Sequence, residues 1–185
     1  MDTSILLIYT GGTIGMKIDP QTQALAPFDF SHIMEEVPEL KKFGYKLDSY
    51  SFDPVIDSSD ADIPFWQELV RIIEINYNKY DGFVVLHGTD TMSYTASALS
   101  FMLENLGKPV IFTGSQLPIG MLRTDGKENL ISSIEIAAAK DDEERALVPE
   151  VCIYFESQLY RGNRTTKYNA ENFRAFRSAN YPVLA

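Results

Sequence analysis

Residues 80–116 read YDGFVVLHGTDTMSYTASALSFMLENLGKPVIFTGSQ, and this stretch decides the fold. Two short apolar runs, residues 83–86 and 110–112, flank a segment whose apolar residues recur at helical spacing. Neither run alternates between polar and apolar residues, which is typical of strands covered on both faces. The stretch therefore predicts a strand, a helix and a second strand, the repeating unit of a parallel α/β sheet.

The same pattern continues on both sides of this stretch. Apolar runs at residues 5–9 and 151–155 predict two further buried strands, and residues 50–56 predict another short one. Helical spacing of apolar residues occurs in four segments: 30–43, 65–77, 92–106 and 130–138. We therefore expect an α/β domain with a doubly wound, mostly parallel sheet and helices on both faces, a Rossmann-like three-layer arrangement.

Capping and breaking residues refine these predictions. Asp62 and Pro64 are placed to cap and open the helix at 65–77, and Gly107 is expected to end the helix at 92–106. Residues 16–28 form the longest stretch without clear periodicity. Loops of that length in compact domains are often lids over a site, so we expect a lid here.

The composition excludes several classes of protein. The chain has 185 residues, 45% of them hydrophobic and 23% charged, which is typical of one globular domain. A net charge of −10 argues against nucleic acid or anionic membranes as partners. One cysteine and two histidines exclude a disulfide framework and argue against a metal site. With no basic leader and a first apolar run too short to span a bilayer, we expect a soluble, cytoplasmic protein.

Small and hydroxyl-bearing residues follow the predicted strands. They form four clusters: TGGTIG at 10–15, DSSD at 57–60, HGTDT at 87–91 and TGSQ at 113–116. The carboxyl ends of strands form the ligand crevice of an open α/β sheet. Any one cluster is more commonly turn or helix-cap material, but several at equivalent positions indicate a site for a small polar ligand. The first cluster matches neither GxGxxG nor GxxxxGK(S/T), which argues against a nucleotide site.

Three motifs are specific enough to indicate a family. They are TGGTIGM at residues 10–16, HGTDTM at 87–92 and YRGNRTTK at 160–167. Together they resemble the L-asparaginase family, specifically its bacterial type I, cytosolic branch, and the similarity extends over nearly the whole chain. The resemblance implies that residues 1–185 are the family's N-terminal α/β domain. It also implies that residues 176–185 start a linker to a second domain, which this sequence lacks.

The resemblance implies hydrolysis of L-asparagine to L-aspartate and ammonia through a threonine nucleophile and an acyl-enzyme, with no cofactor and no metal. The implied catalytic residues are the nucleophile Thr13 with Thr89, Asp90 and Lys167. The residues implied to bind the substrate are Gly12, Ser58, Ser59, Gly88, Thr89, Asp90 and Ser115. A regulatory asparagine site near Thr166 and a homo-oligomer, a dimer or tetramer, are implied as well.

The chemistry of these residue types is consistent with such a role. A threonine hydroxyl is a poor nucleophile until a base takes its proton, and amide cleavage needs donors at the developing oxyanion. Lys167 can act as a base only when neutral, whereas an adjacent carboxylate favours the ammonium form. We therefore treat Thr89, Asp90 and Lys167 as one coupled proton-handling unit. His87 and Cys152 are predicted to be structural, the latter as a buried inert thiol.

Two other functions stay open at this point. The first is a glutamine-using relative, because one methylene changes pocket affinity by only about 1–3 kcal/mol. The second is a non-catalytic domain that binds an amino acid or a partner. The lid also departs from the family, whose members often carry a tyrosine there. Residues 16–28 contain none; Gln23 and Ala24 occupy that region, and Phe28 is the nearest aromatic residue.

Overall fold

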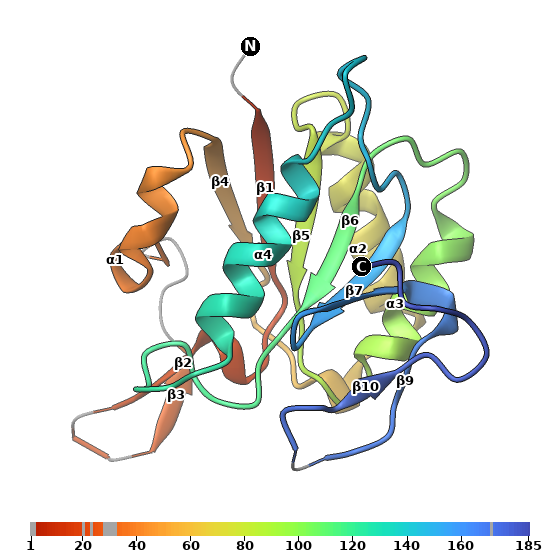
Figure 1. Cartoon of the computed structure of the whole chain (residues 1–185). Helices are drawn as coiled ribbons and strands as arrows, with labels where there is room; N and C mark the ends of the chain where they lie inside the picture. The colour runs from red at the N-terminus through yellow and green to blue at the C-terminus, as the bar shows by residue number, and fades with distance from the viewer. Residues whose placement is uncertain (1–2, 20, 23, 28–32, 171) are drawn as a thin grey trace.

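A computed structural model describes residues 3–19, 21–22, 24–27, 33–170 and 172–185. Its centre is a six-stranded sheet with the strand order β4-β1-β5-β6-β7-β8 (Figure 1). The strands are β1 (Ser4–Tyr9), β4 (Lys46–Ser51), β5 (Gly82–Leu86), β6 (Val110–Thr113), β7 (Val151–Phe155) and β8 (Gln158–Arg161). All neighbours pair in parallel except β8, which is antiparallel to β7. The predicted doubly wound, mostly parallel sheet is confirmed.

Helices cover both faces of this sheet (Figure 1). On one face lie α2 (Ile63–Asn76) and α3 (Met92–Met102), and on the other lie α1 (Ile33–Glu36) and α4 (Gly126–Ala138). Every residue of β5 and β7 is buried, which explains why these strands read as continuous apolar runs. The predicted three-layer arrangement therefore follows from burial on both faces.

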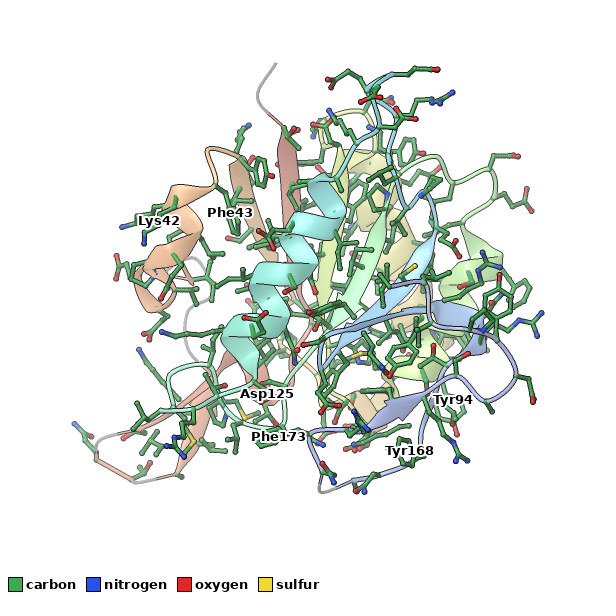
Figure 2. All side chains as sticks on the ribbon, viewed as in Figure 1. Lys42, Phe43, Tyr94, Asp125, Tyr168 and Phe173 are labelled. Carbon is green, nitrogen blue, oxygen red and sulfur yellow. The ribbon has the colours of Figure 1, made fainter. Side chains whose placement is uncertain are left out.

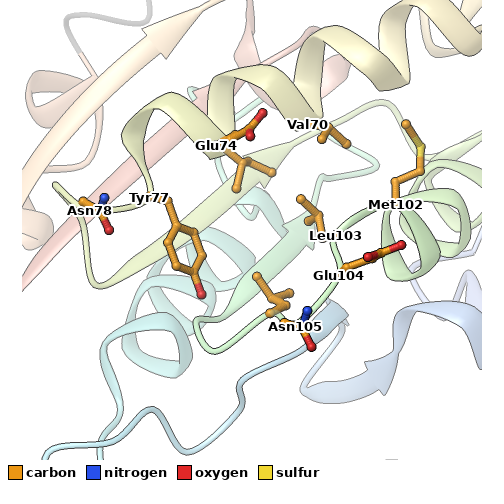
Figure 3. Close-up of a pocket in the computed structure, with 10 residues that line it drawn as sticks. Val70, Glu74, Tyr77, Asn78, Met102, Leu103, Glu104 and Asn105 are labelled. Carbon is orange, nitrogen blue, oxygen red and sulfur yellow. The ribbon is translucent and has the colours of Figure 1, made fainter.

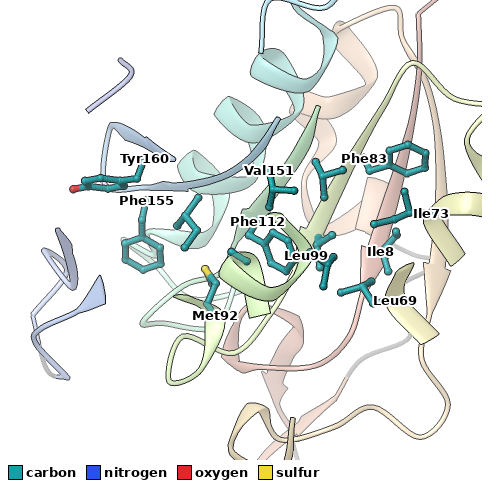
Figure 4. Close-up of a cluster of buried hydrophobic side chains, with 14 of the residues drawn as sticks. Ile8, Leu69, Ile73, Phe83, Met92, Leu99, Phe112, Val151, Phe155 and Tyr160 are labelled. Carbon is teal, nitrogen blue, oxygen red and sulfur yellow. The ribbon is translucent and has the colours of Figure 1, made fainter. Parts of the chain in front are cut away.

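Alternate residues of each central strand enter two separate cores. In β1, Ile5 and Leu7 join the core beneath α4, whereas Leu6 and Ile8 join the core beneath α2 and α3. Figure 4 shows the second core, where Leu69 of α2 and Leu99 of α3 meet strand residues. The sheet is thus held from both sides, and its strand ends are placed rigidly.

Two helix predictions differ at their ends. Asp62 caps α2 as predicted, accepting a hydrogen bond from the Phe65 N–H at 3.0 Å. The helix predicted over 92–106 ends earlier, at Met102, so Gly107 is not its stop. Leu103 already leaves the helical conformation with a ψ of 86°, and Asn105 follows with a φ of 54°. The Gly107 N–H donates to the Tyr77 hydroxyl. Helix α4 begins at Gly126, before the apolar pattern that predicted it.

The strand predicted over residues 50–56 is wrong in its bounds. Strand β4 spans Lys46–Ser51 and lies at the edge of the sheet, where most of its side chains are exposed. An edge strand needs no apolar run, and the apolar residues Phe52 and Ile56 lie in the segment that follows it. That segment crosses the end of β1, where the Ile56 N–H donates to the Thr10 carbonyl at 2.9 Å.

The predicted helix over residues 30–43 is broken. Helix α1 covers Ile33–Glu36, and a 3₁₀ helix at Pro38–Lys42 follows it. Pro38 has no N–H to donate and favours such a break. Phe43, labelled in Figure 2, ends this segment and stacks on Tyr45 at the start of the turn into β4. Residues 30–32 lie outside the described residues.

The loop predicted as a lid contains a small hairpin. Strands β2 (Met16–Ile18) and β3 (Leu25–Pro27) pair antiparallel, although the sequence shows no clear periodicity there. The role of this segment as a lid stays a prediction. Ile18 and Leu25 lie opposite each other in this hairpin, and both are exposed. Gln23 and Phe28 lie outside the described residues, and Ala24 precedes β3.

The C-terminal part of the chain returns to the sheet. After β8 come a 3₁₀ helix (Gly162–Arg164) and β9 (Thr166–Lys167), which pairs antiparallel with β10 (Phe176–Arg177). Phe176 is buried, and the Leu184 N–H donates to the Leu159 carbonyl of β8. The assignment of residues 176–185 to a linker stays a prediction. In the described part of the chain, no helix has the length and apolarity needed to cross a membrane.

Candidate functional site

A cavity of about 320 Å³ opens at the carboxyl edge of the sheet, beside β1 and β5. This is where an open α/β sheet holds its ligand. The cavity is lined by Gly12, Thr13, Met16, Val55, Ile56, Asp57, Ser58, Gly88, Thr89 and Asp90. Three of the four clusters that the sequence singled out therefore meet here.

Two glycines let these segments touch. Gly12 has a φ of 90° and a ψ of 167°, a backbone conformation that is essentially restricted to glycine. A Cβ atom at Gly12 would lie 2.7 Å from the Gly88 Cα, and one at Gly88 would lie 2.5 Å from the Ser58 Oγ. The loops after β1, β4 and β5 are thus in direct contact. Side chains larger than hydrogen would separate them.

Lys167 reaches this edge from a distant part of the chain. Its Nζ donates to the Thr89 Oγ1 at 2.8 Å, across 78 residues of sequence, and to the Asp90 Oδ1 at 2.7 Å. The Lys167 side chain is only 12% exposed, whereas that of Asp90 is 65% exposed. An ammonium that is largely shielded from water depends on these two partners. The position of Lys167 on β9, paired with β10, holds it there.

The loop after β4 supplies the third wall. Ser58 is buried, and its carbonyl accepts a hydrogen bond from the Thr91 hydroxyl at 2.6 Å. The Asp57 Oδ1 accepts the Ser59 N–H at 2.9 Å, and this hydrogen bond holds the pKa of the Asp57 carboxyl below its ordinary value. Asp57 thus stays ionised and fixes the turn that carries both serines.

Comparison with known proteins assigns the chain to a family. The family model for the asparaginase N-terminal domain matches residues 4–185. The chain belongs to the asparaginase family. The predicted resemblance is confirmed at the level of the family and of this domain.

Individual relatives agree with this assignment. The chain is 47% identical to L-asparaginase 1 of Escherichia coli K12, over 98% of this chain and 52% of that protein. The crystal structure of L-asparaginase I from Vibrio cholerae matches with a TM-score of 0.86 at 44% identity, over 100% of this chain and 53% of that one. The thermostable L-asparaginase from Thermococcus kodakarensis matches with a TM-score of 0.81 at 30% identity, over 98% of this chain and 53% of that one. The chain spans about half the length of each of these relatives.

Not every predicted site residue of this asparaginase-family domain lines the cavity. Thr13, Ser58, Thr89 and Asp90 do, with Gly12 and Gly88, and Lys167 joins two of them by hydrogen bonds. Ser59 is exposed on the turn beside Ser58. Thr166 is exposed on β9, next to Lys167. The roles of all these residues stay predictions.

Ser115 is a predicted site residue that is not among those lining the cavity. It is 3% exposed and its hydroxyl donates to the Leu117 carbonyl within its own loop. Conversely, Met16, Val55, Ile56 and Asp57 line the cavity although the sequence did not predict them as site residues. Asp57 begins the DSSD cluster, which is the one signal that pointed to it. Met16 ends the TGGTIGM motif, whereas Val55 and Ile56 are apolar and belong to none of the quoted motifs or clusters.

A larger cavity of about 530 Å³ lies elsewhere on the domain, between the C-terminal ends of α2 and α3 (Figure 3). Figure 3 shows the apolar Val70, Leu103 and Met102 among its lining residues, together with the carboxylates of Glu74 and Glu104. It lies away from the carboxyl edge of the sheet, and none of its lining residues belongs to the family motifs. The chemistry therefore points to the smaller cavity.

Metal-ligating and thiol groups add little to the site. Among the described residues, no three His, Cys, Asp or Glu side chains are grouped so that they could hold a metal ion. Cys152 lies within β7, and burial raises the pKa of its thiol. A buried thiol of this kind is not a nucleophile. The hydroxyl, carboxylate and amine groups at the carboxyl edge are the reactive groups that remain.

Proposed function

We propose that the protein to which this domain belongs hydrolyses L-asparagine to L-aspartate and ammonia. The observation that carries the proposal is Lys167, whose ammonium joins Thr89 and Asp90 at a cavity that Thr13 also lines. Acyl transfer through a covalent intermediate needs a hydroxyl nucleophile and a group nearby that handles its proton. The family and the cavity together favour an amide of a small amino acid as substrate.

Thr13 is the proposed nucleophile. Its hydroxyl oxygen adds to the side-chain amide carbon, the C–N bond breaks, and the hydroxyl proton leaves with the nitrogen as ammonia. Water then adds to the resulting ester, the bond to Thr13 breaks, and aspartate leaves with the threonine hydroxyl restored. Thr89, Lys167 and Asp90 handle these protons as one coupled unit. The mechanism needs no metal and no cofactor.

Backbone N–H groups are proposed to stabilise the charge that develops on the carbonyl oxygen. The peptides at residues 12–13 and 88–89 border the cavity, and each such donor is worth about 10²–10³ in rate. Asp90 is proposed to accept the α-ammonium group of the substrate, while Ser58 and Ser59 donate to its α-carboxylate. These contacts would hold the amide carbon close to the Thr13 hydroxyl.

The remaining assignments concern regulation and assembly. The backbone at Ser115 is proposed to lie against the leaving amide, and Thr166 to belong to a regulatory asparagine site. We further propose a cytoplasmic homo-oligomer, a dimer or tetramer, in which the second domain of a neighbouring protomer completes the cavity. Positioning of reactants can account for about 7–11 kcal/mol of a barrier, so this wall would matter greatly. The domain alone is then expected to hydrolyse asparagine poorly.

Ammonia release tests the proposal directly. The 185-residue chain and a chain extended by the second half of a family member are compared at equal concentration, each with asparagine and with glutamine. We expect the extended chain to release ammonia from asparagine, and the Thr13→Ala variant of it to fold but lose this activity. Activity within tenfold of the unmutated chain would rule out Thr13 as sole nucleophile. Asparagine binding without ammonia release would instead favour a binding domain.

A further inference from the structure

His87 follows β5 directly and lies beneath the candidate site. Its side chain is 1% exposed. The imidazole ring packs against two aromatic rings, with its centroid 5.7 Å from that of Phe65 and 6.0 Å from that of Phe112. Phe112 is labelled in the core view of Figure 4. The surroundings of the ring are thus those of an apolar core side chain.

One nitrogen of the ring has a specific partner. The His87 Nδ1 lies 2.7 Å from the Gly88 carbonyl oxygen. A carbonyl oxygen only accepts hydrogen bonds, so Nδ1 must carry a proton, and in the neutral ring Nε2 then carries none. Burial lowers the pKa of His87 to about 4, which keeps the ring in this neutral form at pH 7. Nε2 is buried and has no hydrogen-bond partner in the described part of the chain.

Packing alone does not explain a histidine at this place. A buried nitrogen without a partner is unfavourable, and a phenyl ring would fill the space without that penalty. The feature that a phenyl ring lacks is the hydrogen bond to the Gly88 carbonyl. A role for the histidine beyond packing must therefore act through its hydrogen bond to the Gly88 carbonyl.

Gly88 connects the strand to the reactive residues. Its backbone is in contact with Gly12 and Ser58, and the next residue is Thr89, which accepts the Lys167 ammonium. A trans peptide is planar, and its C=O and the following N–H point in opposite directions. Fixing the Gly88 carbonyl therefore also fixes the direction of the Thr89 N–H, at a cavity that both residues line.

We propose that His87 is a positioning residue of the proposed active site, which orients the Gly88–Thr89 peptide by its hydrogen bond to the Gly88 carbonyl. The proposal rests on the proposed function. His87 touches no substrate and exchanges no proton in the reaction. Its effect passes through the peptide that presents the Thr89 N–H and hydroxyl to the substrate.

Two kinds of variant separate this role from packing. His87→Phe keeps an aromatic ring but removes the hydrogen-bond donor. If the larger phenyl ring prevents folding, His87→Leu takes the place of His87→Phe as the apolar variant. His87→Asn removes the ring but can place its side-chain N–H where Nδ1 lies. All are made in the extended chain, and kcat and KM for asparagine are measured with the thermal unfolding midpoint. A merely structural residue would lose activity in step with stability.

We expect His87→Phe to keep stability but lose turnover, and His87→Asn to lose stability but keep turnover. His87→Phe should unfold at or above the temperature of the unmutated protein, yet lose about 10- to 100-fold in kcat with a KM within about threefold, because small misplacements are costly to the chemical step. His87→Asn should unfold at a lower temperature but keep kcat within about threefold of the unmutated value. Equal losses of kcat in both variants, or an unchanged kcat in His87→Phe, would overturn the proposal.

Crystal structures of these two variants give a readout that does not depend on turnover. The Gly88 carbonyl and the Thr89 N–H should be displaced in His87→Phe and retained in His87→Asn. An unmoved peptide in His87→Phe would also overturn the proposal. If the unmutated extended chain releases no ammonia while the peptide moves as expected, the proposed function fails and the orientation of the peptide by His87 stands.

Discussion

The ends of β5 and β6 are similar in sequence but differ in use. The two strands are neighbours, paired in parallel, and each continues into a glycine followed by a hydroxyl residue, Thr89 or Ser115. After β5 the chain enters α3 at Met92, and its loop lines the cavity. After β6 the chain runs through a longer loop before α4 begins at Gly126. Glycine and hydroxyl residues after a strand are therefore not sufficient to line the cavity.

The difference lies in where the polar groups find their partners. The backbone of the β6 loop is bonded mostly within the loop: the N–H groups of Gln116 and Leu117 donate to the Asp125 carboxylate, which is labelled in Figure 2, and Ser115 donates to Leu117. The Gln116 side-chain amide donates outside the loop, to the carbonyls of Ala170 and Asn172. At the β5 end, Thr89 and Asp90 are joined by Lys167 from far along the chain. A loop whose hydroxyl and N–H groups bond to one another has fewer of them free to bind a ligand.

The largest expected effect tests the long-range partner of the β5 end. Lys167→Met and Asp90→Asn should each lower asparagine turnover by about 10²–10⁴, and the double variant should lose little more than either alone, because groups acting as one proton-handling unit are not additive. Steady-state ammonia release from the extended chain measures this.

Unfolding experiments provide the control for this pair. Asp90 is 65% exposed, and an ion pair with an exposed partner contributes only about 1 kcal/mol or less to stability. Both single variants should therefore remain folded. Losses of turnover that simply multiply in the double variant would mean that Lys167 and Asp90 act independently, and the contrast with the β6 end would lose its basis.

Much of the fold could be predicted from the sequence because burial leaves a clear pattern. Strands such as β5 are covered on both faces and must be apolar throughout. Edge strand β4 has no such requirement, and its prediction was displaced toward Phe52 and Ile56. The end of α3 was misplaced because the backbone leaves the helical conformation at Leu103, with a ψ of 86°, although the apolar spacing continues to Leu106.

The sequence could predict which reactive residues belong to the candidate site, but it could not predict the hydrogen bonds that these residues make. The motifs pointed to Thr13, Thr89 and Lys167, and the fold supplies the proximity of the last two by pairing β9 with β10. No local pattern reveals that Ser115 donates to its own loop, since that depends on the path of the chain to α4. Nor does a pattern reveal apolar lining residues such as Val55, which carry no reactive group.

The next largest effect concerns the contact between the ends of β1 and β5. Gly12→Ala places a Cβ 2.7 Å from the Gly88 Cα in a backbone conformation that suits only glycine. Strain and overpacking together should lower the free energy of unfolding by about 4 kcal/mol. The matched control is Gly44→Ala, because Gly44 has a φ of 69° but nothing within 4 Å of the added Cβ. Denaturant unfolding of both variants measures the difference. Equal losses would show that the close contact adds nothing to the strain.

A smaller effect concerns how the stability depends on pH. It comes from His87, a buried titratable side chain at the β5 end, and the described residues at the β6 end include no such histidine. The pKa of His87 is lowered from 6.5 to about 4 in the folded protein, so the unfolded chain binds more protons between these values. Stability should then be unaffected above pH 6.5 and fall as the pH drops toward 4, by about 3 kcal/mol in all. The His87→Phe variant should lack this part of the acid sensitivity, while the carboxylates contribute equally to both proteins. Unfolding free energies measured for both from pH 4.5 to about 7.5 test this, and parallel curves would contradict it.

The smallest effect is expected at the β6 end itself. Ser115→Ala removes a hydroxyl whose hydrogen bond goes to the Leu117 carbonyl, and the proposed contact of this loop with the leaving amide uses the backbone. The variant should cost about 1 kcal/mol of unfolding free energy, the net value of one hydrogen bond. Turnover of asparagine by the extended chain should change by less than about threefold, because the loop retains the Asp125 carboxylate as acceptor for the Gln116 and Leu117 N–H groups. A loss above tenfold without unfolding would mean that the Ser115 hydroxyl turns toward the substrate when it binds. The Ser115 hydroxyl would then bond to the Leu117 carbonyl only while no substrate is bound. With substrate present, the loop after β6 would bind it through a hydroxyl, as the loop after β5 is proposed to do.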